Sequence, residues 1–120
     1  MQKVYETWGK QADFLWVYTK EAHASDGTRP ARHVEIPQHK TIEDRKKAAT
    51  SCGASLNLTI PVLLDDMNNS VATAFHGHPD RLFILSPNGT IVYRGGKGPW
   101  GFDVDEMRAA LEKLVQAQKK

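Results

Sequence analysis

The chain has 120 residues, 40% of them hydrophobic and 25% charged, which is the composition of one soluble globular domain with its own core. A net charge of +2 without a basic run of five or more residues argues against a nucleic-acid partner, and no apolar stretch approaches the roughly 20 residues of a membrane span. Cys52 is the only cysteine, and the N-terminus lacks the pattern of a signal peptide, so we expect a cytoplasmic protein without an internal disulfide.

The first forty residues predict a helix, a strand and a long loop. Apolar residues recur at helical spacing over 2–12, which favours a helix. The strand is expected over 14–20, where five consecutive apolar residues indicate burial on both faces, as in a parallel sheet. Residues 21–40 contain one glycine and two prolines and are expected to form a loop, and loops of this length in small domains are often functional.

Helices and short strands alternate in the rest of the chain. Thr41 and Asp44 form a variant capping box, which predicts a helix through about Cys52 that ends at Gly53. Asp65-Asp66 is expected to end a strand and cap a helix rather than to act as an acid pair. We expect a strand over 61–65 and a helix over 69–76 that ends at Gly77. Strands over 81–86 and 90–94 are expected to be joined by a turn at Asn88-Gly89. A last helix is capped by Asp103 and Glu106, and its expected buried stripe consists of Val104, Met107, Leu111, Leu114 and Val115.

This order of elements predicts one α/β domain over residues 1–120. Helical crossovers imply parallel strands, and the hairpin adds an antiparallel edge, so we expect a mixed sheet with helices on both faces. The arrangement is most of a thioredoxin-like sheet. That fold normally begins with a strand and a cysteine-containing turn, whereas this chain begins with a helix, so both pieces are expected to lie before Met1.

The segment Glu21-Ala22-His23-Ala24-Ser25-Asp26-Gly27 is the first candidate site, because it directly follows the predicted buried strand. Open α/β sheets place their ligands at the carboxyl ends of their strands. An imidazole titrates near neutral pH, so His23 with Glu21 suits proton transfer or ligand binding. A polar loop with a solvated histidine remains the alternative.

Five segments of the chain together resemble one enzyme family in their order. The sequence resembles the iodothyronine deiodinases and their bacterial deiodinase-like relatives, which have the thioredoxin fold. The matching segments are EAHASDG at 21–27, IPQHKTIEDRKKAA at 36–49, PVLLDDMNN at 61–69, PDRLFIL at 79–85 and GTIVYRGGKGPWGF at 89–102.

The resemblance implies an oxidoreductase that removes iodide reductively from an aromatic ring with the help of thiols. Such enzymes use a selenocysteine or cysteine just after the first strand, at a helix N-terminus that stabilises the anion. This chain has no residue in that position, so we expect it to be inactive alone, with no metal and no cofactor. The alternative is a non-catalytic small-molecule-binding or protein-interaction module derived from the fold.

The resemblance also assigns roles to individual residues. Glu21 and His23 match an acid and a histidine implied in substrate binding and proton delivery, and His39 matches a histidine of the loop. Lys97 falls where the animal enzymes have an arginine that grips the substrate; lysine keeps the charge but loses the planar fork that suits a carboxylate. Trp100 is expected to help line a substrate pocket. A plain connection between hairpin and helix remains the alternative for this glycine-rich loop.

Other expectations concern Cys52, metals and partners. Cys52 is expected to be a packed core thiol. His76 with His78, and His33 with His39, lack the carboxylate or cysteine partners of a zinc site, so no metal is expected. The expected partners are a small aromatic or thiol substrate and a second copy of the chain, which would pair through a strand edge left exposed by the missing strand. No partner is expected in nucleic acid or membrane.

Overall fold

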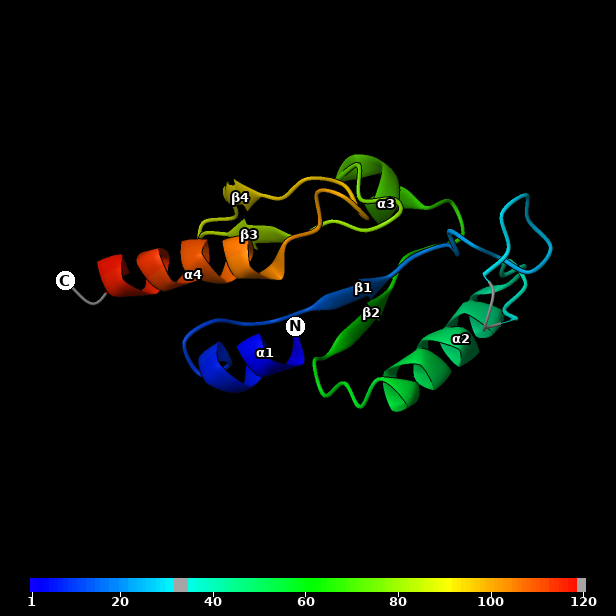
Figure 1. Cartoon of the computed structure of the whole chain (residues 1–120), viewed down its shortest axis with the longest axis horizontal. Helices are drawn as coiled ribbons and strands as arrows, with labels where there is room; N and C mark the ends of the chain where they lie inside the picture. Colours follow the sequence, from blue (N-terminus) through cyan, green and yellow to red (C-terminus); the bar gives the residue numbers. More distant parts are fainter. Residues whose placement is uncertain (32–34, 119–120) are drawn as a thin grey trace. The chain divides into compact units, whose positions relative to one another are not determined.

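The computed structural model describes residues 1–31 and 35–118 (Figure 1). The chain forms two compact units. The parallel unit comprises residues 14–76 together with Gln2, and the hairpin unit comprises Met1, residues 3–13 and the chain from Gly77 onward. Each unit combines helices with one pair of short strands, so the predicted mixed α/β class is confirmed.

In the parallel unit, β1 (Trp16–Tyr18) pairs with β2 (Val62–Leu64) in parallel. Val17 lies opposite Leu63, and α2 (Ile42–Ser55) connects the two strands. The parallel direction is as predicted from the helical crossover. β1 is shorter than the predicted strand over 14–20, because β2 offers three residues for pairing.

The start of α2 follows the predicted capping pattern. The Thr41 hydroxyl accepts a hydrogen bond from the Asp44 backbone N–H at 3.1 Å. The Asp44 carboxylate accepts from the Lys40 backbone N–H at 3.2 Å, and this hydrogen bond lowers the pKa of Asp44. The first turn of α2 therefore has side-chain acceptors for backbone donors that have no partner inside the helix.

The predicted end of α2 at Gly53 is wrong, since the helix continues to Ser55. Asn57 takes the left-handed conformation with φ of 53°, which asparagine tolerates better than most residues. The Asn57 N–H donates to the Ala54 carbonyl at 3.3 Å, and the Leu58 N–H donates to the Gly53 carbonyl at 3.0 Å. These two bonds form a Schellman closure with asparagine in the place usually taken by glycine.

Asp65 joins β2 to α3 (Ser70–Ala74) from a fully buried position, with 0% of its surface exposed. Its carboxylate accepts hydrogen bonds from the backbone N–H groups of Asp66, Val71 and Ala72, each at 2.9 Å. The expectation that Asp65-Asp66 ends a strand and caps a helix is confirmed. The buried charge is compensated by backbone donors at the start of the helix.

The bounds of α3 differ from the predicted helix over 69–76 at both ends. Asn69 precedes the helix with φ of 57°, and His76 follows it with φ of 50°. The His76 N–H donates to the Thr73 carbonyl at 3.2 Å. The predicted stop at Gly77 is therefore wrong by one residue, because His76 makes the left-handed turn itself.

The hairpin unit contains β3 (Phe83–Leu85), antiparallel to β4 (Ile91–Arg94), and α4 (Val104–Gln118). α1 (Gln2–Trp8) belongs to it from its second residue onward. Gly89 has φ of 87° in the turn, so the predicted Asn-Gly turn is confirmed. α4 buries three apolar residues of the predicted stripe, namely Met107, Leu111 and Val115.

The described residues form two separate two-stranded sheets, β1–β2 and β3–β4, rather than the predicted single mixed sheet. Among the described residues before β1, Gln2–Trp8 form a helix that buries Val4, four residues shorter than the predicted helix over 2–12, and no strand is present there. Both sheets therefore remain at two strands, below the three that usually make a sheet stable by itself.

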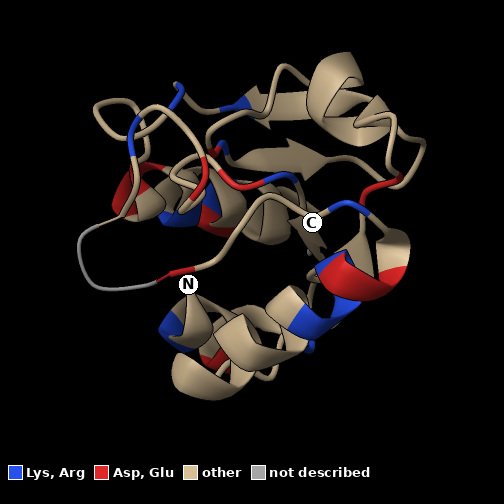
Figure 2. Cartoon of the chain, turned by 90° about the vertical axis from the view of Figure 1, so that its right-hand side faces the viewer, with Lys and Arg blue, Asp and Glu red and all other residues tan. Residues whose placement is uncertain are grey.

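The surface agrees with the modest net charge. Lys and Arg are interspersed with Asp and Glu along the helices and loops (Figure 2). Across the described ranges 1–31 and 35–118, no helix combines the length and the apolarity needed to span a membrane.

We expect Asp65→Ala to lower the free energy of unfolding by about 3 kcal/mol, because it leaves buried backbone N–H groups without an acceptor. Urea unfolding monitored by circular dichroism measures this loss. Asp105→Ala removes a carboxylate whose side chain is 92% exposed and is the matched control, with an expected change within about 0.5 kcal/mol. A loss below about 0.5 kcal/mol for Asp65→Ala would contradict this role.

Candidate functional site

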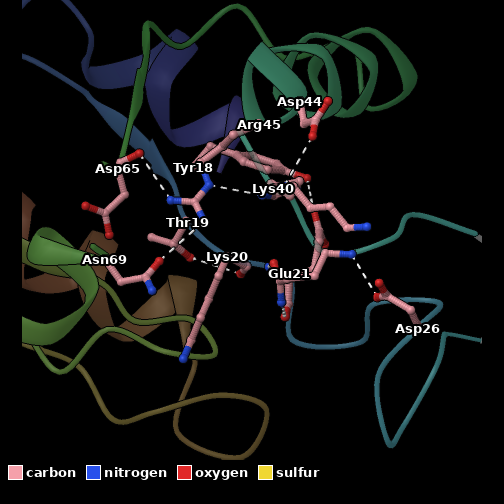
Figure 3. A network of polar contacts seen from close by, with 12 residues as sticks. Tyr18, Thr19, Lys20, Glu21, Asp26, Lys40, Asp44, Arg45, Asp65 and Asn69 are labelled. Atoms are coloured by element: carbon pink, nitrogen blue, oxygen red, sulfur yellow. Dashed lines mark hydrogen bonds and ion pairs between the residues drawn. The ribbon is translucent and has the colours of Figure 1, made fainter. Parts of the chain in front are cut away.

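The candidate site begins at the carboxyl end of β1, with Tyr18 and Glu21 (Figure 3). The Tyr18 hydroxyl donates a hydrogen bond to the Glu21 carboxylate. Burial raises the pKa of Tyr18, and the hydrogen bond to Glu21 raises it further. Tyr18 is therefore a neutral donor at physiological pH, and Glu21, which is half-buried, is its acceptor.

His39 and Arg45 extend this pair into a network. The Glu21 Oε1 atom lies 3.2 Å from Nε2 of the buried His39. The Arg45 Nε–H donates to His39 Nδ1 at 3.0 Å. Because a guanidinium can only donate, Nδ1 must be an unprotonated acceptor, and the His39 proton resides on Nε2 and is donated to Glu21. We call Tyr18, Glu21, His39 and Arg45 the polar network.

Arg45 is fixed by further hydrogen bonds from its other nitrogens. Its Nη1 donates to the backbone carbonyls of Asp66 at 2.7 Å and Asp65 at 3.2 Å. Its Nη2 donates to the Asn69 side-chain carbonyl at 3.3 Å. Arg45 belongs to α2, and it contacts both His39 of the long loop and the segment between β2 and α3. One side chain therefore connects three parts of the parallel unit (Figure 3).

The long loop is held together near the network, although Glu21 and His39 are 18 residues apart. The Gln38 side chain bonds the Glu21 backbone reciprocally, accepting from its N–H at 2.9 Å and donating to its carbonyl at 3.0 Å. The Asp26 carboxylate accepts from the Gln38 N–H at 2.9 Å. These bonds place His39 against Glu21 from the far end of the loop.

His23 lies outside the polar network. It is exposed, and its Nδ1 lies 2.9 Å from the Arg29 carbonyl. A carbonyl only accepts, so Nδ1 carries a proton and donates the hydrogen bond to the Arg29 carbonyl. The hydrogen bonds of Glu21 go to Tyr18 and His39, so the structure brings Glu21 together with His39, and the catalytic role of His23 stays a prediction.

Lys97 and Trp100 belong to the hairpin unit, whereas Glu21, His23 and His39 belong to the parallel unit. Both side chains are exposed, and Trp100 is 98% exposed. The Gly101 N–H donates to the Lys97 carbonyl at 2.8 Å, and a Cβ on Gly101 would lie 2.6 Å from the Gly96 Cα. Glycine is required for this tight loop, which presents Lys97 and Trp100 at its tip.

Cys52 is half-buried, and burial followed by the charge of Glu21 raises the pKa of its thiol. A thiol in this state is a weak nucleophile at neutral pH. Within residues 1–31 and 35–118, no three histidine, cysteine or carboxylate side chains group as metal ligands would. His33 lies outside the described residues.

Tyr18 and Arg45 are the two network residues that sequence reasoning missed. Tyr18 looked like one more apolar strand residue, and its distance of three residues from Glu21 was the available signal. Arg45 lies in the charged run Glu43-Asp44-Arg45-Lys46-Lys47, which is typical of an exposed helix face. Its position four residues before the buried Ala49 places it on the inner face of α2, and this spacing could have identified it.

Comparison with known proteins gives a single family. The family model described as iodothyronine deiodinase matches residues 1–115. The chain is 38% identical to a thyroxine 5-deiodinase of Ovis aries over 113 residues, and 38% identical to that of Homo sapiens over 119 residues. These alignments cover 93% of this chain and 38% and 36% of the relatives, so the chain spans less than two fifths of the length of these mammalian proteins. The match over almost all of its residues shows that this chain belongs to the iodothyronine deiodinase family.

Proposed function

We propose that this chain supplies the acid–base part of a deiodinase-like, thiol-dependent reductive enzyme. The observation that supports it is the polar network at the carboxyl end of β1, where a tyrosine, a carboxylate and a neutral histidine are joined in series. Replacing iodine by hydrogen on an aromatic ring needs two electrons and a proton at the ring carbon. Thiols supply the electrons, and a network of this type supplies the proton.

The proposal includes a thioredoxin-like fold with one further strand and a nucleophilic cysteine or selenocysteine beside it. Its support is the pair of two-stranded sheets, which leave strand edges open to an additional strand. The chain itself holds Cys52 alone, with a raised pKa and a position on α2 rather than after a first strand. We therefore propose that the 120 residues by themselves do not complete a catalytic cycle.

The proposed substrate is a small aromatic molecule with an anionic group. Lys97 supports the anionic group, since its ammonium is exposed at the tip of a glycine-tight loop, and Trp100 beside it offers an exposed aromatic face. Thyroxine, which the relatives' name gives as their substrate, is the first compound to test. Lysine grips a carboxylate as a point charge rather than as a fork, so weaker binding of thyroxine is expected than for an arginine at this position.

Self-association and a cytoplasmic location complete the proposal. The exposed apolar side chains of the β1–β2 sheet, Val62 and Leu63, support pairing of two copies through a strand edge. The single cysteine supports a reducing compartment.

A binding module without catalysis is the second candidate function. The observation that favours it is Trp100, which is almost fully exposed on a loop whose shape is fixed by two glycines. Exposed aromatic side chains on rigid loops are frequent anchors of binding surfaces.

We expect no iodide release from thyroxine above the protein-free rate when the chain is incubated with dithiothreitol. The reason is that Cys52 is predominantly a protonated thiol. Cys52→Ser is the matched control and should give the same rate. Turnover by the chain that Cys52→Ser abolishes would contradict the proposal and would make Cys52 the nucleophile.

A ligand-binding measurement distinguishes the two candidate functions, an enzyme part and a binding module, from a fragment without function. We expect thyroxine at one hundred times its dissociation constant to stabilise the chain by about 2.7 kcal/mol in a thermal-shift titration. His23→Ala should raise the thyroxine concentration needed for this stabilisation about tenfold. His76→Asn, which replaces another exposed histidine with a residue that tolerates its positive φ, should leave it unchanged. Stabilisation that is equal in all variants would remove His23 from the binding site.

A further inference from the structure

Among the described residues of the parallel unit, Arg45 is the cationic side chain most removed from solvent, with 2% of its surface exposed. Among the described residues it has no ion pair with a carboxylate. Its guanidinium instead donates to the backbone carbonyls of Asp65 and Asp66, to the Asn69 side chain and to His39. The position of this cation is therefore set by neutral acceptors, one of which is an imidazole nitrogen.

The bond to His39 constrains the protonation of that ring. Protonation of Nδ1 would turn the acceptor of the Arg45 Nε–H into a second donor, so that two N–H groups would face each other at 3.0 Å. It would also place an imidazolium against a buried guanidinium. Both effects disfavour the charged ring, because like charges and unpaired buried donors are costly.

Among the described residues, the charged and titratable groups that contact His39 belong to the polar network. Tyr18 comes from β1, with ring centroids 5.7 Å apart. Glu21 comes from the loop after β1 and accepts from Nε2. Arg45 comes from α2. Asp65 and Asp66 meet Arg45 through their carbonyls, while the Asp65 carboxylate is taken up by the backbone donors at the start of α3.

We propose that Arg45 is a positioning residue that keeps His39 neutral with its proton on Nε2, so that His39 meets Glu21 as a neutral donor rather than as a cation. The importance of Arg45 for catalysis rests on the function proposed above, whereas the protonation state of His39 does not depend on that function. Glu21 then receives hydrogen bonds from two neutral donors, Tyr18 and His39, and remains the one charged acceptor of the network.

Nitrogen-15 NMR of the histidine side chains tests this inference on the full chain. His39 is assigned by comparison with His39→Gln. In the unsubstituted chain at about pH 7, we expect Nδ1 to be the unprotonated nitrogen and Nε2 to carry the proton. In Arg45→Met, which keeps an unbranched apolar stem and removes every donor, the population with the proton on Nδ1 should rise about tenfold.

Arg45→Lys keeps the charge but loses the planar fork, and it should change the tautomer population of His39 by less. Arg108→Met removes an exposed arginine of α4 and should leave it unchanged. If Arg45→Met does not fold, the unsubstituted chain and Arg45→Lys still decide the result. A protonated Nδ1 in the unsubstituted chain at about pH 7, or equal tautomer populations in the chain and in a folded Arg45→Met, would overturn the inference. Iodothyronine binding is measured separately, so a protein with the expected tautomer but no binding would refute the proposed function and leave this inference intact.

Discussion

The burial of one positive charge, Arg45, is the constraint on which the parallel unit depends. Removing a guanidinium from water is costly unless each of its donors finds an acceptor. The acceptors come from three places: His39 at the end of the long loop, the carbonyls that follow β2, and Asn69 before α3. These segments must occupy fixed positions around α2 at the same time. The same requirement brings His39 to Glu21 and so assembles the polar network.

Beside Arg45, the carboxylate of Asp65 is a buried negative charge that also requires compensation. The two residues do not form an ion pair through the Asp65 carboxylate, which faces three backbone N–H groups, while Arg45 takes the Asp65 carbonyl. Each charge is thus compensated by backbone dipoles of the β2–α3 segment. Placing a cation on carbonyls and an anion on N–H groups also orders the backbone of that segment, which an isolated side-chain pair would not do.

Local sequence patterns predicted the helices and strands well. The features that these patterns missed depend on tertiary contacts. The capping pair Thr41 and Asp44, the Asn-Gly turn and the apolar stripe of α4 depend on neighbouring residues, so they were visible in the sequence. The ends of α2 and α3 were misplaced because Asn57 and His76 take left-handed conformations for which glycine seemed the natural candidate. The pairing of Glu21 with His39 depends on how a twenty-residue loop closes through Gln38, and Arg45 was hidden in a charged run. No periodicity encodes the contact between Glu21 and His39, whereas the spacing of Arg45 from the buried Ala49 indicates that it lies on the inner face of α2.

Detection of the hydrogen bond between Arg45 Nε and His39 Nδ1 is the most direct test of this account. In a nitrogen-15-labelled chain, an N–H···N bond transmits a measurable scalar coupling between the two nitrogens. We expect this coupling to be present in the folded chain at about pH 7 and the Arg45 Nε–H to exchange slowly with water. A folded chain in which the coupling is absent and the Arg45 Nε–H exchanges as fast as that of the exposed Arg108 would contradict it.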